Sequence, residues 1–389
     1  MKSAKRATRQ PRPDTNAHCI NHVVLGRGGV GRRVNVILGS GDMDYVKYVM
    51  AELHACGHLR GELIAREMNK RYNDIRMDIK MDMFQSDTIG TSLMVFLRMH
   101  QQAFLDRMIA VKRLGIKTAY DVDDDLFNIP PECAERYDMF KDPTFVGRHQ
   151  EFVQAADAVI VSTKTLAGVI KQHTHSPVFI VPNSLDIQNW EATFAKRMTT
   201  EPSDIVTIGW TNSSFHIFGV PIIEEALVQI MEEFPNVRFH SIGFVNLEHF
   251  KTGRMEAFKD RCVCEDWVPI DRFPEAMVDM DIGIAPLNDC KYNLSRSGIK
   301  WMQYSALGIP SVVSPYQPYE EVITDNETGM FAKMNTPKGW YDCLKKLVVD
   351  RDLRIKMGFK ARREVLDKHD IRNNVAIWHD CYKQIMELK

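Results

Sequence analysis

Apolar and polar positions follow a regular alternation along the first half of the chain. Short apolar runs are separated by segments in which apolar residues recur every three or four positions. This pattern predicts buried strands joined by amphipathic helices. An amphipathic helix is predicted from Tyr45 to Ala55, ending at Gly57. The strands are predicted at residues 34–40, 117–122, 157–162 and 178–182.

The same pattern starts again after a polar stretch at residues 197–204. A long helix is expected over residues 221–234. Further strands are predicted within residues 205–210, 237–244, 262–269, 281–287 and 310–314. Two consecutive β/α units predict an α/β protein with two Rossmann-like domains, each built on a parallel sheet. A ligand is expected in the central cleft between them, at the carboxyl ends of the strands.

The predicted domain limits follow from this division. They are a basic flexible tail at 1–15, an N-terminal domain at 16–198, a C-terminal domain at 199–375, and a C-terminal helix at 376–389 that can return to the first domain. The chain of 389 residues is also too long for one ordinary core.

Composition narrows the class of protein. Apolar residues make up 44% and charged residues 26%, values typical of soluble globular proteins. The net charge of −1 gives the chain as a whole no electrostatic preference for nucleic acid or anionic membrane. No apolar run has the length expected of a membrane span, and the eight cysteines form no disulfide framework. We therefore expect a cytoplasmic protein, in the host cytoplasm if a phage encodes it, with reduced thiols.

Two glycine-rich segments resemble phosphate loops. Residues 25–33 have the glycine spacing of a Walker loop, but Arg32 and Arg33 replace the lysine and the hydroxyl residue. Gly39 and Gly41 lie between a predicted strand and a predicted helix. Their G-x-G-x-x-D pattern lacks the third glycine of a dinucleotide fingerprint. A glycine turn at that place can still face a phosphate or a sugar.

An acidic cluster follows the predicted strand at 117–122. Residues 120–130 read YDVDDDLFNIP, and Asp121 and Asp123 form an Asp-x-Asp. Because the cluster lies at the carboxyl end of a strand, these side chains are expected at the ligand site. They can act as metal ligands, as acid–base groups, or as caps of the following turn.

The most informative segment is residues 285–314. A strand is expected to end at Leu287, and a helix is predicted to begin near Ser297 and to end before Gly308. Arg296, Lys300 and Gln303 are spaced i, i+4, i+7, which places them on one helical face. Two cations, nearby hydroxyls and a helix N-terminus suit a diphosphate.

Five segments, in order, resemble the retaining family-four (group 1) glycosyltransferases, in the subgroup common in surface-polysaccharide and phage gene sets. That family has the GT-B fold. The segments are YDVDDDLF (120–127), residues 156–190 with VPNSLD, residues 205–243 with IVTIGWTNSSFH, FPEAMVDMDIGIAPL (273–287), and residues 296–332 beginning RSGIKWMQY. Together they cover most of the chain.

The resemblance implies that the C-terminal domain holds a nucleotide-sugar donor. Arg296 and Lys300 match the basic positions that bind the donor diphosphate, and Ser297 is expected to add its hydroxyl there. The loop at Thr211, Asn212, Ser213 and Ser214 matches a donor-binding loop whose backbone N–H groups can hold phosphate oxygens. Val268 and Pro269 fall where backbone groups meet the base. Gln303 stands where the family usually has the glutamate that binds the ribose.

The resemblance implies that the N-terminal domain holds the acceptor. Asp124 and Asp125 best match an acidic pair near the reacting sugar, with Asp123 beside them. The Asp-x-Asp metal motif belongs to a different glycosyltransferase fold. With Arg296 and Lys300 available for the leaving diphosphate, we expect no metal and no cofactor other than the co-substrate.

The expected function is transfer of a hexosyl or pentosyl group to an acceptor hydroxyl with retention. Three alternatives remain open at this point: transfer to a modified base in DNA, for which the basic tail is the hint; an inactive sugar-nucleotide binder, for which Gln303 is the argument; and, more remotely, a nicotinamide dehydrogenase.

Overall fold

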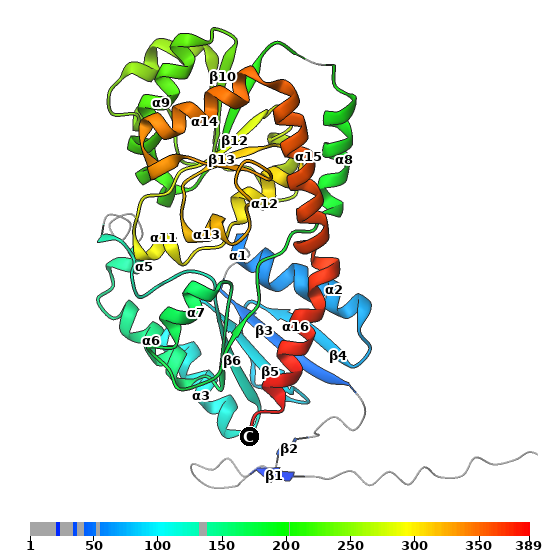
Figure 1. The fold of residues 1–389 in the computed structure, drawn as a ribbon. Coiled ribbons are helices and arrows are strands. Elements are labelled where there is room, and N and C mark those ends of the chain that lie inside the picture. The colour runs from blue at the N-terminus through cyan, green and yellow to red at the C-terminus, as the bar shows by residue number, and fades with distance from the viewer. Residues whose placement is uncertain (1–20, 24–33, 37–42, 52–54, 132–137, 202) are drawn as a thin grey trace, which may run out of the picture.

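The computed structural model describes residues 21–23, 34–36, 43–51, 55–131, 138–201 and 203–389. The predictions made for the basic tail, for residues 25–33, and for Gly39 and Gly41 fall outside these residues. The described chain forms two α/β domains placed end to end (Figure 1). This confirms the predicted α/β fold of two Rossmann-like domains.

The first domain is built on a six-stranded parallel sheet in the order β4-β3-β5-β6-β7-β8. Strands β5 and β7 are apolar over their full length, as expected for strands covered on both faces. The strands are β3 Asp44–Met50, β4 Ile75–Lys80, β5 Leu93–Leu97, β6 Lys117–Val122, β7 Ala158–Val161 and β8 Val178–Ile180. A separate antiparallel pair consists of β1 Asn21–Val23 and β2 Val34–Val36.

The second domain is built on another six-stranded parallel sheet, in the order β11-β10-β9-β12-β13-β14. Each strand predicted from residue 205 onward is present, and a short sixth strand, β14, follows them. The strands are β9 Val206–Thr211, β10 Val237–Ile242, β11 Cys262–Glu265, β12 Ile282–Ala285, β13 Ser311–Val313 and β14 Met330–Phe331.

Helices cover both sheets (Figure 1). Those from residue 55 to residue 199 are α1 Ala55–Gly57, η1 His58–Glu62, α2 Leu63–Arg71, η2 Gln85–Thr88, α3 Gln102–Arg113, α5 Asp138–Lys141, α6 Phe145–Ala155, α7 Lys164–Ile170 and α8 Gln188–Thr199. Those that follow are η3 Ser214–Gly219, α9 Val220–Glu233, η4 Leu247–His249, η5 Arg254–Arg261, α10 Phe273–Ala276, α11 Lys291–Leu294, α12 Ile299–Ala306, α13 Gln317–Glu320, η6 Lys333–Asn335, α14 Pro337–Val349, α15 Arg351–Lys368 and α16 Ile371–Met386.

The predicted helix at Tyr45–Ala55 is wrong. Residues Asp44–Met50 form strand β3, and helical structure begins only at Ala55. In this stretch Val46 and Tyr48 are buried while Tyr45 and Lys47 are more exposed, which is a period of two. The β-branched and aromatic side chains also favour a strand. The helix N-terminus that was expected at Tyr45 is therefore absent, and a strand stands in its place.

One helical stretch, Ser214–Glu233, is long and apolar enough to span a membrane by length and composition alone. It comprises η3 and α9. Residues of α9, among them Ile223, Leu227 and Ile230, are fully buried in the core of the second domain, where α9 packs against α14. We therefore interpret it as a core helix of this domain.

The C-terminal helix connects the two domains. Helix α15 packs on α12 of the second domain, and α16 then runs along the first domain (Figure 1). Val375, Trp378 and Tyr382 of α16 are buried in one cluster with Val46 and Tyr48 of β3. The return helix thus begins at Ile371 rather than at residue 376.

Candidate functional site at the interdomain junction

The order of the strands locates the expected ligand positions. In the second sheet the chain starts at β9, proceeds outward through β10 and β11, and then returns to the other side of β9 with β12. In the first sheet the corresponding reversal lies between β3 and β5. Open α/β sheets bind ligands outside the carboxyl ends of their strands at such reversals. We call the place where the two sets of carboxyl ends meet the junction.

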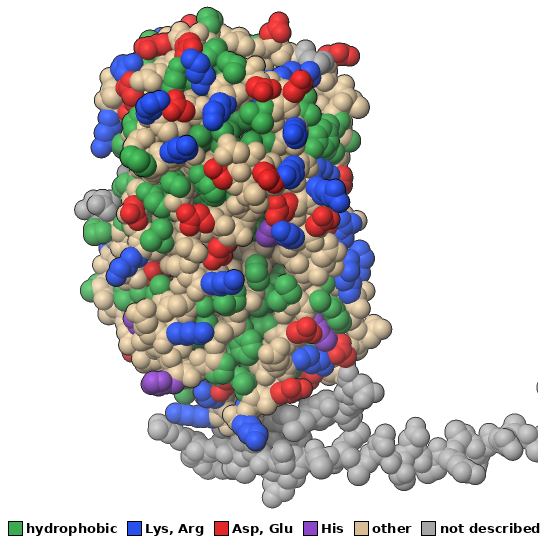
Figure 2. Space-filling model, viewed as in Figure 1, with side chains coloured by type: hydrophobic (Ala, Val, Ile, Leu, Met, Phe, Trp, Pro, Cys, Tyr) green, Lys and Arg blue, Asp and Glu red, His purple; other side chains and the backbone are tan. Residues whose placement is uncertain are grey.

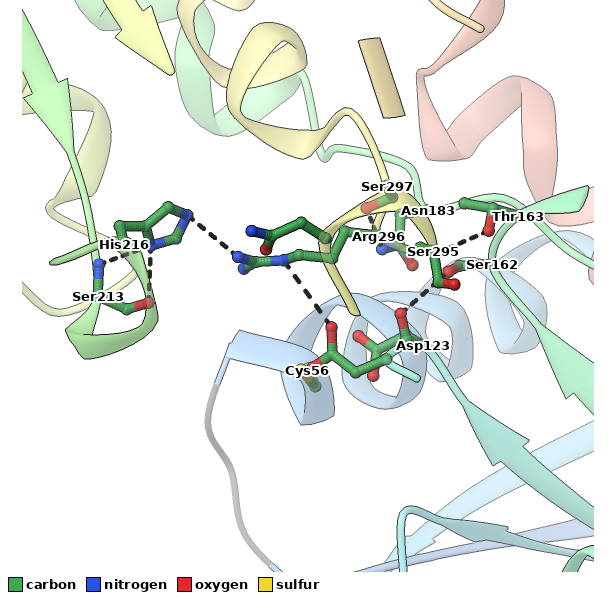
Figure 3. Close-up of polar contacts among 12 residues, drawn as sticks. Cys56, Asp123, Ser162, Thr163, Asn183, Ser213, His216, Ser295, Arg296 and Ser297 are labelled. Carbon is green, nitrogen blue, oxygen red and sulfur yellow. Dashed lines mark hydrogen bonds and ion pairs between the residues drawn. The ribbon is translucent and has the colours of Figure 1, made fainter. Parts of the chain in front are cut away.

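Direct contacts join the domains at the junction. The Thr163 hydroxyl, at the start of α7, donates to the Ser295 carbonyl at 2.9 Å, and Asn183 Nδ2 donates to Ser297 Oγ at 3.0 Å (Figure 3). The predicted phosphate-binding hydroxyl of Ser297 is therefore engaged by the first domain. These bonds hold the 295–297 loop of the second domain against the first.

Arg296 occupies the centre of the junction. It precedes α12, which begins at Ile299, so Arg296 lies in the approach to the helix rather than on its face. Its guanidinium lies 5.8 Å from the centre of the Tyr292 ring and has two polar neighbours. Nη1 lies 3.3 Å from His216 Nε2 in the second domain (Figure 3). Nε lies 4.0 Å from Asp124 Oδ1 in the first domain.

Lys300 adds a second cation one turn further along. Burial, and then repulsion by Arg296, lower the pKa of Lys300 to about 7. Its ammonium lies 5.7 Å from the Phe273 ring centre. Among the described residues no carboxylate forms an ion pair with it. Two close cations with little counter-charge constitute a site for an anion.

Gln303 lies on α12 with Lys300. Its Oε1 is a buried acceptor with no hydrogen-bond partner among the described residues. An unpaired buried acceptor is costly unless a ligand supplies a donor. This suits a ligand hydroxyl, as the matched position in the resembled family implies.

The loop after β9 differs from the prediction. The Thr211 amide donates to the Tyr304 hydroxyl and the Asn212 amide to the Ile242 carbonyl, each at 2.9 Å. Asn212 is fixed further by Gly243, whose φ of +120° and close approach to the Asn212 carbonyl leave no room for a Cβ. These two amides therefore serve the protein itself and do not point to a phosphate.

Ser213 and His216 form the other part of this loop. The Ser213 amide donates to His216 Nδ1 at 3.0 Å, and the Ser213 hydroxyl lies 2.8 Å from the same nitrogen. His216 is 4% exposed, and burial followed by the charge of Arg296 lowers its pKa well below the usual range. From the sequence, His216 could reach a phosphate because it follows the donor loop, although a lone histidine in a polar turn is more often a surface residue. The structure buries it instead.

The two positions proposed for the base lie elsewhere in the second domain. Val268 packs partly buried against the cluster around Trp301 and Tyr304, while Pro269 is exposed. Trp267, next to them, is 68% exposed. This loop follows β11, at the carboxyl edge of the same sheet, so the positions are compatible with contact to a base.

The four acids of the Asp cluster separate into different roles. Asp121 is fully buried, and its oxygens bond Arg60 Nε at 2.7 Å and the Tyr48 hydroxyl at 2.5 Å. Asp121 is therefore part of the core of the first domain and unsuited to hold a metal with Asp123. Asp125 caps the following turn, accepting from the Phe127 amide at 3.2 Å and the Asn128 side chain at 2.9 Å. Burial raises the pKa of Asp125.

Asp123 and Asp124 face the junction. Arg98, the first residue after β5, donates from Nη1 to Asp124 Oδ2 at 2.9 Å and to Asp123 Oδ1 at 3.2 Å. Burial raises the pKa of Asp123, but the charges of Arg98 and then Arg60 lower it by more, so that the pKa lies below its usual value. Arg98 Nη1 also lies 3.1 Å from Cys56 Sγ. The sequence prediction missed Arg98 because it did not predict strand β5.

Arg98 has a left-handed backbone, with φ of +47°. This conformation is costly for a side chain with a Cβ and is concentrated at functional sites. The Arg98 amide donates to the Asp121 carbonyl at 2.9 Å, which fixes the turn. Its position at the reversal of the first sheet places a guanidinium among the acids.

Taken together, the two facing Rossmann-like domains have the GT-B fold, with cations on one side of the junction and carboxylates on the other. Residues 203–350 match the family model "Glycosyl transferases group 1". This part of the chain therefore matches a group 1 glycosyltransferase domain. No curated protein matches the chain.

Solved structures share the fold at low sequence identity. HepE from Anabaena, in complex with UDP and glucose, superposes with a TM-score of 0.62 at 13% identity, covering 89% of this chain and 100% of that one. Sucrose-phosphate synthase from Thermosynechococcus elongatus superposes with a TM-score of 0.63 at 10% identity, covering 89% of this chain and 100% of that one. A glycosyltransferase from Rickettsia africae superposes with a TM-score of 0.61 at 13% identity, covering 90% of this chain and 100% of that one.

Proposed function

We propose that the protein transfers a hexosyl or pentosyl group from a nucleotide-diphosphate sugar to an acceptor hydroxyl, with retention and without a metal ion. The observation that carries this proposal is the pair of cations, Arg296 and Lys300, beside carboxylates at the junction. Negative charge grows on the departing diphosphate, and fixed cations stabilise it there. HepE, which shares the fold, was solved with UDP, so UDP is the first probe.

The acceptor side follows from the first domain. Asp124 is held by Arg98 and can orient an acceptor hydroxyl or take its proton. We propose a cytoplasmic reaction, in keeping with the free thiols of the six cysteines within the described residues. We propose no cofactor beyond the nucleotide sugar. The acceptor can be a glycan, a protein or modified DNA.

Calorimetric titration of UDP tests the cation site. We expect the R296A/K300A variant to lose at least about a hundredfold in affinity, because each charge-assisted contact contributes about 1.5–3 kcal/mol. K338A is the matched control, since Lys338 is an exposed cation paired with Asp342 on α14. Unchanged affinity in the double variant would refute the proposed diphosphate site.

Turnover distinguishes an enzyme from an inactive binder, the alternative favoured by Gln303. UDP-, GDP- and ADP-sugars are supplied with candidate acceptors, and nucleotide release is measured. Binding without release under all conditions supports the binder. The anomeric configuration of the product tests retention, and activity in chelator tests metal independence.

A further inference from the structure

His216 and Arg296 meet in an arrangement that no contact among the described residues explains. His216 Nε2 and Arg296 Nη1 are 3.3 Å apart, and both come from the second domain. Figure 3 shows the imidazole directed at the guanidinium, with Ser213 behind it. Whether this is a hydrogen bond depends on which imidazole nitrogen carries the proton.

The Ser213 amide decides the tautomer. Its hydrogen has a fixed direction and points at His216 Nδ1, at an N–N distance of 3.0 Å. The Ser213 hydroxyl, 2.8 Å from Nδ1, can rotate to donate as well. Nδ1 is therefore an acceptor without a proton. Since burial keeps the imidazole neutral, the proton lies on Nε2.

Two donors thus face each other. A guanidinium has five N–H donors and no acceptor, so Arg296 Nη1 cannot accept from Nε2–H. The nearest carboxylate, Asp124, lies 4.0 Å from a different nitrogen, Nε. Two convergent donors, on a 4%-exposed imidazole and a guanidinium, require one shared acceptor between or beside them. Lys300, which also lowers the pKa of His216 through its charge, adds a second positive group beside Arg296.

We propose that His216 Nε2–H and the Arg296 guanidinium together hold one oxygen of the donor diphosphate. This inference rests on the proposed function and assigns His216 to it as a phosphate-binding residue. Ser213 is then a positioning residue, because its amide fixes the tautomer that makes Nε2 a donor. The Ser213–His216 pair occurs in a capping box, a motif otherwise used to begin a helix.

The tautomer itself is measured first, by nitrogen-15 NMR of the histidine side chains in the free protein, with H216Q used to assign the signal. We expect Nδ1 of His216 to be unprotonated and Nε2 to be protonated, and the Nε2 proton to shift when UDP is added. A protonated Nδ1 in the free protein would overturn the inference, since Nε2 would then simply accept from Arg296.

Affinity is measured next, with UDP and with uridine. H216A is expected to bind UDP about tenfold more weakly and uridine unchanged, because one hydrogen bond to a charged group is lost. H216Q is expected to recover most of this loss, since glutamine at this position of a capping box can accept from the Ser213 amide and still offer an N–H donor. The double variant H216A/R296A should lose less than the product of the two single losses, because both groups bind one oxygen.

H249A is the matched control. His249 forms the same kind of capping box with Asn246, whose amide donates to His249 Nδ1 at 3.2 Å in η4. The H249A variant shows what the loss of a capping box alone does to the protein. We expect its UDP affinity to equal that of the wild type. Equal UDP affinities in wild type and H216A would refute the role of His216.

Pyrophosphate separates this inference from the proposed function. If pyrophosphate shifts the His216 signal but no nucleotide or nucleotide sugar binds, the anion site stands and the proposed function fails. If UDP binds and turnover occurs while the His216 signal and the H216A affinity are unaffected, the proposed function stands and the inference fails.

Discussion

The two sheets differ in strand order and in the charge that they bring to the junction. The second sheet has the order of a dinucleotide-binding fold, and at its reversal lie His216, Arg296 and Lys300, all donors. The first sheet reverses between β3 and β5, where Arg98 is surrounded by Asp123, Asp124 and Cys56. The backbone thus determines where each site lies, while the side chains determine what it can bind.

The contrast has a chemical consequence. The cations of the second domain are suited to the negative charge of a diphosphate, and the carboxylates of the first domain are suited to accept a hydroxyl proton. Among the described residues, Arg296 forms one ion pair with the Asp cluster, in which its Nε lies 4.0 Å from Asp124 Oδ1. On the surface as a whole the signs are mixed: Figure 2 shows Lys, Arg, Asp and Glu interspersed over both domains on this face. The separation of charge is therefore local to the junction.

The largest effect is expected from Asp124. D124N should lower the rate of nucleotide release from the active sugar nucleotide by about 10²–10⁴-fold, the usual contribution of a positioned acid–base group. Stability should change little, because an amide oxygen at this position can still accept from Arg98, and Asp123 still pairs with the same guanidinium. Stopped assays and thermal unfolding measure the two quantities.

D125A is the control on the same turn. It should mainly lower the free energy of unfolding, by about 1–3 kcal/mol, because the part-buried Phe127 amide and Asn128 side chain lose their acceptor. A D125A variant that loses activity as completely as D124N, with unchanged stability, would reverse the assignment of these two acids.

The sequence pattern was sufficient for the second domain and less so for the first. Apolar runs bounded by turns revealed β9, β10, β11, β12 and β13, and helix α12 ends as predicted before Gly308, whose φ is +68°. In the first domain Asp44–Met50 contains enough polar residues at helical spacing to resemble a helix. Hydrogen bonding to β4 and β5 makes this segment a strand. Those partners are distant in the chain, so the sequence of the segment alone does not reveal the pairing.

The site divides along similar lines. Charge type and spacing pointed to Arg296, Lys300 and the Asp cluster, because those residues are adjacent in sequence. The roles of the individual acids were not predictable. Asp121, for example, pairs with Arg60, which lies 61 residues earlier in the chain. Arg98 and His216 matter through partners on other elements, and such partners become visible only once the sheets are assembled.

A second prediction concerns Asp121, the acid of the cluster that lies in the core of the first domain and not at the junction. Asp121 and Arg60 are both fully buried, and Arg60 also donates to the Val181 carbonyl and to Asn183. D121N should cost about 3–5 kcal/mol of unfolding free energy, because it leaves a buried guanidinium without its counter-charge. Denaturant unfolding measures this loss, and R60M/D121L should recover much of it because no unpaired charge remains.

Burial raises the pKa of Asp121 to about 6 although Arg60 opposes the shift, so the carboxylate is ionised at neutral pH and the pair is charged there. UDP affinity of the folded D121N variant should match that of the wild type. A loss of affinity at full stability would move Asp121 to the ligand site.

The smallest effect is expected from pH, through Lys300. Its pKa in the ligand-free protein is about 7, against an ordinary value of 10.5, so above pH 7 the amine is increasingly neutral. A bound diphosphate favours the charged form, so binding takes up a proton and UDP affinity falls as pH rises, by at most about tenfold per unit between pH 7.5 and 9.5. Titration in buffers of different ionisation enthalpy measures the proton uptake.

The same shift has the opposite sign for stability without ligand. Between pH 7 and 10.5 the unfolded chain binds more protons at this lysine than the folded chain, so the free energy of unfolding from this group rises with pH across that window. K300R, which stays charged, should bind UDP with a nearly flat pH profile and lack this rise. A wild-type affinity that is independent of pH, with no proton uptake, would show that Lys300 does not meet the phosphate and would leave Arg296 and His216 as the groups that hold it.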